Sequence, residues 1–267
     1  DGEMVRKNQG MDFTRSLHTA LGYEKNFKKA LSVKTEVYYQ YLYGIPVDIF
    51  PSSFSLINQG SGFQRFFPER LVNEGTGQNY GVELTVQKYF DQNLFYLFTA
   101  SLFESKYTGS DGIERNTDFN GNYAFNFLAG KEFKIKDKNV LSAGFGVTAA
   151  GGRRYGFVNV AATEAANELV YLDSLFNERQ FRDYFRLDFR FTYKINTPKL
   201  THEIGLDLIN ILNTQNILAL AYAPNLIDPS AEPIAERMQL GFLPIFYYRV
   251  DFRLNKIADK RKDSLSQ

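Results

Sequence analysis

The residues that could carry chemistry in this sequence are few and far apart. Two histidines, His18 and His202, are its candidates for acid–base catalysis or metal binding. Both roles need convergent partners, and neither histidine has a metal-ligand or nucleophile pattern beside it. Cysteine is absent, which excludes disulfides and thiolate metal sites. We therefore expect solvated or interfacial histidines, no metal, no cofactor and no enzymatic activity.

A short run of Arg153, Arg154 and Tyr155 is better suited to binding than to catalysis. Guanidinium groups present several fixed donors, so these residues could meet an anionic or sugar-like ligand. Pairing with neighbouring loops is the more ordinary role for such side chains, and it is the one we favour.

A second group of candidates is aromatic and lies in a Pro- and Gly-containing stretch between residues 44 and 76. It consists of Phe50, Phe54, Phe63, Phe66 and Phe67. These side chains could contact a substrate, with Phe63, Phe66 and Phe67 as the chosen candidates. The competing interpretation is that they pack a long loop or belong to an interfacial aromatic girdle.

Long two-faced strands must position these residues. Between residues 184 and 196 apolar and polar residues alternate with a period of two, which is typical of a strand with one apolar face. The apolar positions are Phe185, Leu187, Phe189, Phe191, Tyr193 and Ile195. About twelve such residues at about 3.3 Å each, tilted near 45°, rise roughly 28 Å, close to the ~30 Å hydrocarbon thickness of a bilayer.

The charges of this strand and the next predict the register of a hairpin over residues 184–212. With Pro198 and Lys199 at the centre of the turn, opposite charges face each other, which is favourable by up to about 1 kcal/mol. The predicted pairs are Lys194 with Glu203 and Arg190 with Asp207 in a polar lumen, and Phe191 with Leu206 outside. Pro198 cannot adopt the positive φ that two-residue hairpins prefer, so we expect a type I turn or a bulge.

The same alternation recurs along the chain and predicts nine strands. Besides the two strands of the hairpin they cover residues 13–27, 31–41, 77–90, 94–107, 123–135, 139–150 and 246–254. No apolar run is long enough for a membrane-spanning helix, while 25 Phe and 17 Tyr interleaved with polar residues suit strands. The net charge of +1 gives no basic excess for nucleic acid.

Short turns and long loops alternate between these strands, which is the pattern of bacterial outer-membrane barrels. A lipocalin-like soluble barrel is the alternative, but its interior is apolar, whereas here one face carries charges at mid-strand. We therefore predict an all-β, antiparallel up-and-down transmembrane barrel in the bacterial outer membrane, in contact with its lipid. Because single-chain bacterial barrels have even strand numbers, nine strands over residues 1–255 suggest the last part of a larger barrel, followed by a polar tail over 256–267.

Four short segments give the chain a resemblance to a known family. They are Leu21 to Glu24, Gly77 to Leu84, Leu206 to Asn213 and Tyr248 to Phe252. In their order and spacing they resemble the C-terminal portion of TonB-dependent outer-membrane receptors, over about residues 17–254. The resemblance implies a 22-stranded barrel closed by an N-terminal plug, which imports scarce bulky nutrients with energy relayed from an inner-membrane complex. The plug and the segment that engages that complex are not found in these residues.

Three classes of function remain in competition on the sequence. The leading one is the barrel part of a nutrient receptor whose substrate, a siderophore, glycan or peptide, the residues do not identify. The second is a barrel that serves as an adhesin or assembly scaffold and binds partners through its long loops. The third, an outer-membrane enzyme, is disfavoured because no catalytic group is recognised.

Overall fold

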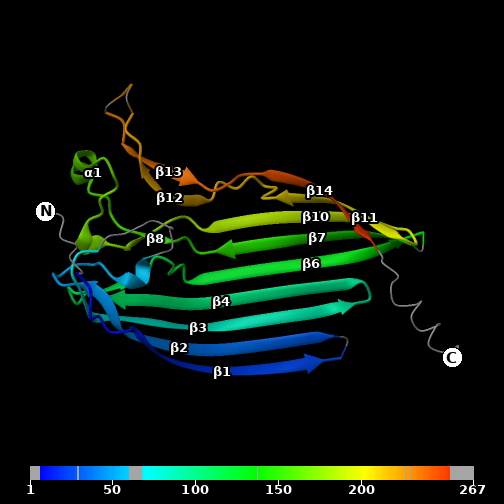
Figure 1. The fold of residues 1–267 in the computed structure, drawn as a ribbon, viewed down its shortest axis with the longest axis horizontal. Helices are drawn as coiled ribbons and strands as arrows, with labels where there is room; N and C mark the ends of the chain where they lie inside the picture. The colour runs from blue at the N-terminus through cyan, green and yellow to red at the C-terminus, as the bar shows by residue number, and fades with distance from the viewer. Residues whose placement is uncertain are drawn as a thin grey trace, which may run out of the picture.

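The computed structural model describes residues 7–28, 30–59, 68–136, 138–225, 227–228 and 230–252. Nine long strands form one antiparallel sheet in which each strand pairs with the strands before and after it in the chain (Figure 1). They are β1 (Arg15–Phe27), β2 (Leu31–Asp48), β3 (Leu71–Asp91), β4 (Leu94–Thr108), β6 (Tyr123–Ile135), β7 (Asn139–Ala150), β10 (Tyr184–Asn196), β11 (Leu200–Ile209) and β14 (Leu243–Phe252). The predicted all-β, up-and-down architecture is confirmed. The predicted tail, 256–267, lies outside the described residues.

The connections divide the sheet into a turn end and a loop end. Short turns at 28–30, 92–93, 136–138 and 197–199 lie together at one end, and the four long connections lie at the other (Figure 1). The loops carry the small elements β5 (Glu114–Asn116), β8 (Arg154–Tyr155), β9 (Arg179–Gln180), β12 (Ile217–Tyr222), β13 (Ile234–Met238), η1 (Leu56–Asn58), η2 (Asp173–Leu175) and α1 (Val160–Ala166). Within the described ranges, no helix has the length and apolar character to cross a membrane.

The two faces of the sheet differ in polarity because the strand registers keep like residues together. Leu21 pairs with Val37, Val37 with Val82 and Val82 with Leu102, so one face is apolar across four strands. These side chains are exposed, at 76% for Leu21 and 56% for Leu102. The other face is polar: at the neighbouring position Glu36 pairs with Glu83. The sheet therefore presents its apolar side outward.

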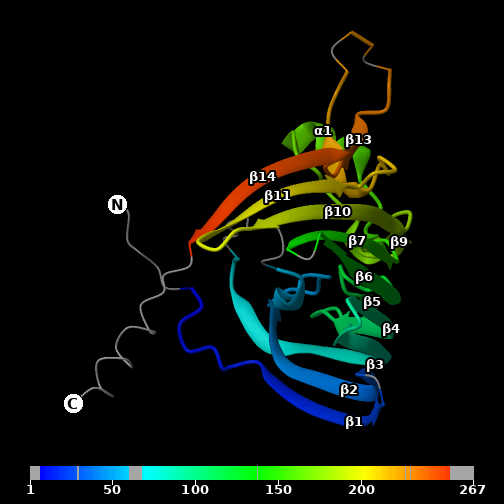
Figure 2. The same ribbon diagram turned by 90° about the vertical axis from the view of Figure 1, so that its right-hand side faces the viewer.

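The sheet is strongly curved (Figure 2). The contact of the inward-folded Ile57 with Gly77 places the polar face on the inside of the curve. Residues 49–58 with η1 fold into the concavity, where the Ile57 side chain lies over Gly77 of the polar face. Close packing there uses aromatic rings set over glycines of the adjacent strand: the rings of Tyr38, Phe95 and Tyr247 lie over Gly81, Gly130 and Gly205. A Cβ at any of these glycines would meet the ring or hydroxyl at 2.9 Å or less.

The described core is small and lies near the loop end. Its buried hydrophobic residues are Ile45, Val47, Leu71 and Tyr107. They come from the ends of β2, β3 and β4, beneath the inward-folded segment 49–59. The strands β1 and β14, at the two edges of the sheet, have one neighbour each in the described chain.

Several strand boundaries differ from the sequence prediction, and the largest differences are in β2 and β3. β14 also begins at Leu243 rather than at residue 246. Residues 44–76 were expected to hold no strand, yet β2 continues to Asp48 and β3 begins at Leu71. The alternation stops at residue 44 because the register shifts twice between Tyr43 and Val47, around Gly44 at a φ of +65°. A bulge breaks the period of two without ending the pairing.

The second leg of the hairpin is shorter than predicted. It was expected to reach residue 212, but β11 ends at Ile209 because Asn210 takes a left-handed conformation, with a φ of +51°. The Asn210 side chain then holds the following turn: its Oδ1 accepts from the Thr214 amide at 3.0 Å and its Nδ2 donates to the Thr214 carbonyl at 3.0 Å. Asparagine tolerates this conformation better than most residues.

Candidate ligand site at the loop end

The β10–β11 hairpin carries a ladder of charges on the concave face, in the register that the sequence predicts. Arg190 faces Asp207, Lys194 faces Glu203, and Phe191 faces Leu206 on the convex side. Neither Pro198 nor Lys199 has a positive φ, so the turn is not a primed one, as expected. Arg190 donates to both carboxylate oxygens of Asp207, from Nε at 2.7 Å and Nη2 at 2.6 Å. Such a bidentate ion pair, with two parallel hydrogen bonds, is stronger and more directional than one with a single contact.

Glu203 is the centre of the second part of this ladder. Its carboxylate accepts a hydrogen bond from Tyr247 Oη at 3.0 Å and lies 2.5 Å from Arg249 Nη2 and 3.7 Å from Lys194 Nζ. The acid side chains are packed against the wall, with Glu203 7% exposed, while the Arg190 side chain is 67% exposed. The cations therefore point into the concavity and remain accessible to water or to a partner.

A hollow of about 440 Å³ lies beside this ladder, on the wall formed by β6, β7 and β10. Its floor includes Gly144 and Gly146, and Phe95, Leu128 and Arg190 line its sides. Small residues on the floor and apolar groups next to a charged pair make this a place where a side chain of another segment could pack.

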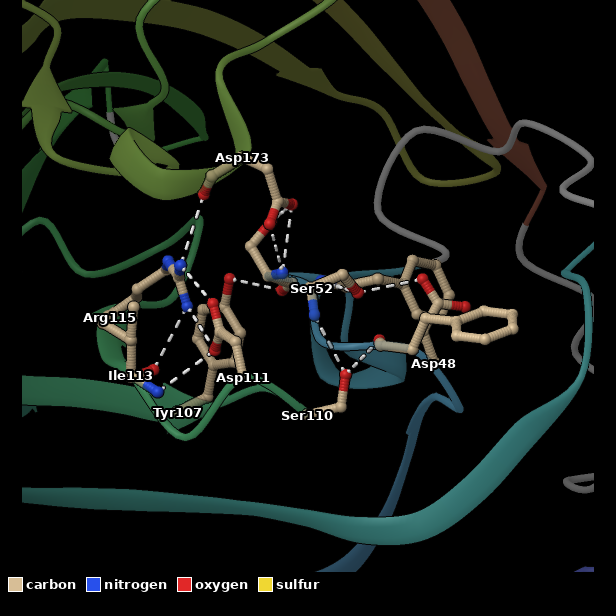
Figure 3. Close-up of polar contacts among 11 residues, drawn as sticks. Asp48, Ser52, Tyr107, Ser110, Asp111, Ile113, Arg115 and Asp173 are labelled. Atoms are coloured by element: carbon tan, nitrogen blue, oxygen red, sulfur yellow. Dashed lines mark hydrogen bonds and ion pairs between the residues drawn. The ribbon is translucent and has the colours of Figure 1, made fainter.

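At the loop end, a buried arginine joins two connections (Figure 3). Arg115 in β5 donates to both oxygens of Asp111, at 2.9 and 2.6 Å, and to the carbonyls of Ile113 at 3.2 Å and Asp173 at 3.3 Å. The Arg115 side chain is only 3% exposed. Its hydrogen bonds lower the pKa of the Asp111 carboxyl, against a smaller opposing effect of burial. The loop 109–118 is thereby tied to the loop 151–183.

The same cluster holds the segment 49–59 inside the curve of the sheet. The Asp173 carboxylate accepts hydrogen bonds from the Ser53 amide at 3.0 Å and from the Ser53 hydroxyl at 2.5 Å. Tyr107 Oη donates a hydrogen bond to the Ser53 carbonyl at 2.9 Å. Ser110 Oγ lies between the Ser52 amide and the Phe50 carbonyl (Figure 3). The backbone of a long loop thus finds its partners in side chains rather than in a strand, which fixes its position.

Arg154 is part of an asparagine network and therefore has a structural role. Its Nε donates to the Asn120 carbonyl at 2.8 Å and its Nη2 to Asn122 Oδ1 at 2.6 Å. Asn120 and Asn122 in turn both donate to the Glu104 carboxylate. For this arginine, pairing with a neighbouring loop is what the structure shows.

Arg153, in contrast, is half-buried and lines two hollows. Its guanidinium lies over the Phe119 ring, 4.5 Å from the centroid, and its buried Nε has no hydrogen-bond partner among the described residues. Two hollows, of about 250 and 130 Å³, are both lined by Arg153 and Phe181. The smaller one is also lined by Tyr155, whose ring stacks on Phe181 at 4.2 Å and 14°. An arginine with unused donors beside stacked aromatic rings can bind a planar or anionic group.

Asp118 places a carboxylate in the same small hollow. Its Oδ1 accepts from Asn177 Nδ2 at 2.8 Å. Burial raises the pKa of Asp118, and this effect outweighs the opposing hydrogen bond from Asn177 and the charge of Arg153. Burial likewise raises the pKa of Tyr171, which lines the same hollow. The site thus combines a cation, a carboxylate, an amide and aromatic rings, which can together recognise a polar ring such as a sugar.

The fold of this chain is similar to a solved structure, whereas two comparisons of its sequence found no match. The chain is similar in structure to the FrpB iron transporter from Neisseria meningitidis (F3-3 variant), with a TM-score of 0.52 and 12% sequence identity. The match covers 90% of this chain. It covers 32% of the transporter chain, so this chain spans about a third of that protein's length. No protein-family model and no curated protein matches the sequence. An identity this low indicates a shared fold only.

The remaining predicted residues have a mixed outcome. Phe63, Phe66 and Phe67 lie outside the described residues, and Phe50 is 77% exposed beside the buried cluster. His18 contacts the Tyr38 ring edge-on, and His202 Nδ1 lies 2.6 Å from Tyr248 Oη. Within the part of the chain that the structure describes, no group of three or more His, Cys, Asp or Glu could hold a metal ion.

Sequence reasoning missed the residues that complete the Arg153 site. Asp118 and Phe119 come from the loop between β4 and β6, and Asn177 comes from a distant part of the loop that also holds Arg153; none of the three was singled out. A signal was present, because residues 111–122 combine Asp, Asn and Gly at a density typical of a structured turn region. Their closeness to Arg153, however, depends on how these two loops fold and pack against each other, and no local pattern encodes that.

Proposed function

We propose that this chain is the C-terminal part of an outer-membrane receptor barrel that imports a scarce bulky nutrient in a TonB-dependent manner. The observation that carries the proposal is the curved, nine-stranded, up-and-down sheet with an apolar convex face and a charged concave face. Lipid would contact the convex face and water or a plug the concave one, which is the polarity of bacterial barrels. The fold similarity to an iron transporter supports this assignment.

The rest of the barrel is part of the proposal. Both edge strands, β1 and β14, have one free side in the described chain, and unpaired strand edges are not tolerated in hydrocarbon. Further strands of the same protein would pair with them and close the barrel, to 22 strands on the family resemblance. An N-terminal plug would fill the concavity, and its contact with an inner-membrane complex would supply energy.

In this arrangement the loop end faces outward and carries the ligand site. Arg153, Tyr155 and Phe181 would contact the nutrient, with Asp118 as an acceptor for its hydroxyl or amide groups. Arg115 and Arg154 would hold the loops in position without touching the nutrient.

A barrel that acts as an adhesin or assembly scaffold is the second candidate. It is favoured by the β12–β13 hairpin and α1, which project from the loop end (Figures 1 and 2). The projecting hairpin and its flanks expose Leu218, Ile227 and Leu240. Exposed apolar residues on a projecting loop suit contact with another protein.

Two measurements test the proposal. Membrane fractionation of the source bacterium should place the full-length protein in the outer membrane, and its deletion should abolish growth on one member of a panel of glycans, peptides and iron chelates. Restoring the gene with Arg153→Gln should weaken uptake of that nutrient at least tenfold, whereas Arg179→Gln, a substitution of an exposed arginine outside the hollow, should not. Normal growth on the whole panel with loss of cell adhesion would favour the scaffold.

A further inference from the structure

The turn end of the sheet has a concentration of lysines that the proposed function leaves without a role. In the sequence, the four short turns hold five lysines and a single carboxylate, Asp137. Of the described ones, Lys28, Lys136, Lys138 and Lys199 are all exposed. No hydrogen bond or ion pair of their ammonium groups is found within the described residues. Four exposed lysines with no partner among the described residues give this end of the sheet a local positive charge.

Two more lysines lie on the convex face just before the turns. Lys25 pairs with Val33, and Lys131 with Leu94 and Ala143, so both belong to the apolar face. Both are exposed. Each ammonium lies over the ring two residues closer to the turn: Lys25 is 5.2 Å from the centroid of Phe27, and Lys131 is 5.4 Å from that of Phe133. The same local arrangement therefore occurs on two strands that are not neighbours.

The described carboxylates near these lysines lie on the other face or already have a partner. Glu24 precedes Lys25 and Glu132 follows Lys131, so both glutamates lie on the concave face. There each carboxylate accepts a hydrogen bond from a serine hydroxyl. Asp91 lies at the turn end but is 3.8 Å from Lys88. At the loop end, in contrast, Lys106 has a carboxylate partner in Glu114 at 3.5 Å. Among the described lysines, those without an ion-pair partner all lie towards the turn end.

We propose that these six residues, the lysine belt of Lys25, Lys28, Lys131, Lys136, Lys138 and Lys199, bind the phosphates of anionic phospholipid headgroups. A lysine at the border of an apolar band keeps its methylene stem in the apolar layer and extends its ammonium to the headgroup level. Aromatic rings favour the same border. Cationic residues close to an anionic lipid surface are attracted to it, each by about a fivefold gain in binding at physiological salt.

The proposal of the lysine belt depends on the proposed membrane location. It adds the class of lipid that the protein binds and the leaflet in which it binds that lipid. The turn end would lie in the periplasmic leaflet, where phospholipid and not lipopolysaccharide forms the surface. The lysines would select the anionic phospholipids of that leaflet and fix the height of the barrel in the bilayer.

The test compares lipids at the surface of the full-length protein in phosphatidylcholine bilayers. Spin-labelled phosphatidylglycerol and spin-labelled phosphatidylcholine of the same chain length report, by electron paramagnetic resonance, the relative association constant at the protein surface. We expect a preference for phosphatidylglycerol of about three- to fivefold at low salt, reduced in 0.5 M NaCl by screening. The variant Lys25→Gln/Lys131→Gln/Lys199→Gln removes half of the belt and should lower the ratio about halfway towards one, whereas the corresponding arginine variant should keep the wild-type ratio.

A matched control removes the same charge elsewhere. Lys34→Gln/Lys134→Gln/Lys106→Gln changes two concave lysines and one at the loop end, and it should keep the preference. Equal loss in both variants, or no preference in the wild type, would overturn the lysine belt while leaving the barrel intact. A stronger, belt-dependent preference for spin-labelled lipid A would also overturn it. Removal of the protein from the bilayer by alkaline extraction would instead overturn the proposed membrane location itself.

Discussion

The charge ladder of the β10–β11 hairpin and the arginine cluster of the loops are built from the same groups in opposite ways. In the ladder, Asp207 and Glu203 are packed into the wall and their cations reach into open space. In the loops, Arg115 is buried and its partners surround it. The ladder joins neighbouring strands, whereas the cluster joins loops that are distant in sequence. The ladder therefore sets the charge of a surface that already exists, and the cluster creates the surface on which the ligand site depends.

The largest effect should come from removing the buried cation. Arg115→Met would leave the Asp111 carboxylate and two carbonyls without their donor, at a cost of about 3–5 kcal/mol. Because the strands do not depend on these contacts, the loss should appear as local opening. Hydrogen exchange followed by mass spectrometry should show faster exchange at residues 49–59 and 109–116.

The control for this variant is Arg179→Met, which removes an exposed arginine that lies over the Phe157 ring in a neighbouring loop. It should leave exchange at residues 49–59 unchanged. Unchanged exchange in the Arg115 variant as well would show that the comparison is wrong and that strand pairing alone orders the loops.

Acid should weaken the same cluster without mutation. The Arg115 hydrogen bonds hold the pKa of Asp111 below its ordinary value, so the carboxylate stabilises the folded loop above the unfolded pKa, and this contribution is lost as the pH falls through the folded pKa. We expect exchange at residues 109–116, corrected for its intrinsic pH dependence, to rise below about pH 4. Arg115→Met should show no such step, and a step of equal size in that variant would assign it to another carboxyl.

In the ladder, Glu203→Gln should have an intermediate effect. The substitution weakens charge-assisted bonds from Arg249 and Lys194, so about 1–3 kcal/mol of stability should be lost. Urea unfolding of the protein in lipid bilayers would measure it. A loss as large as that of Arg115→Met would remove the contrast between a wall that tolerates charge changes and loops that do not.

Arg190→Gln should cost less, about 1 kcal/mol or below, because the removed cation is largely exposed and water can replace it at Asp207. The same urea experiment applies, and high salt should reduce the difference from wild type. If the cost stayed constant in 1 M NaCl, packing of the arginine stem rather than its charge would be responsible.

The smallest effect, and one of opposite sign, is expected for Glu83→Gln. Glu83 lies directly across from Glu36 on the concave face, and like charges in facing positions are unfavourable by a few tenths of a kcal/mol. The variant should be slightly more stable than wild type at low salt. Destabilisation would mean that Glu83 has a stabilising partner in the barrel.

The comparison also explains which features could be read from the sequence. The register of Lys194 with Glu203 and of Arg190 with Asp207 follows from a turn, a period of two and charge pairing, all of which act over fewer than twenty residues. The predicted strand ends were wrong where a single residue adopts a positive φ, as at Gly44 and Asn210.

The loop cluster was out of reach for a different reason. Asp173 and Ser53 are 120 positions apart, and no periodicity connects them. Arg153 and Arg154 have identical side chains at adjacent positions, yet one is held in a network and the other faces a hollow. Only the path of the loops separates these outcomes.

The location of the small core at one end of a sheet with a bare apolar face has a consequence for how the chain acquires its fold. Four hydrophobic residues are buried among those described, while the convex face keeps Leu21, Val82 and Phe246 in contact with solvent. Hydrophobic collapse in water would therefore bury little apolar surface, and a denatured sample diluted into buffer should aggregate. The same chain diluted into short-chain lipid should gain ordered strands. Contact with hydrocarbon is favourable for the exposed apolar face, and backbone groups without a hydrogen-bond partner are unfavourable there. If the proposed membrane location holds, the bilayer takes part in folding, and the folding yield should depend on lipid thickness.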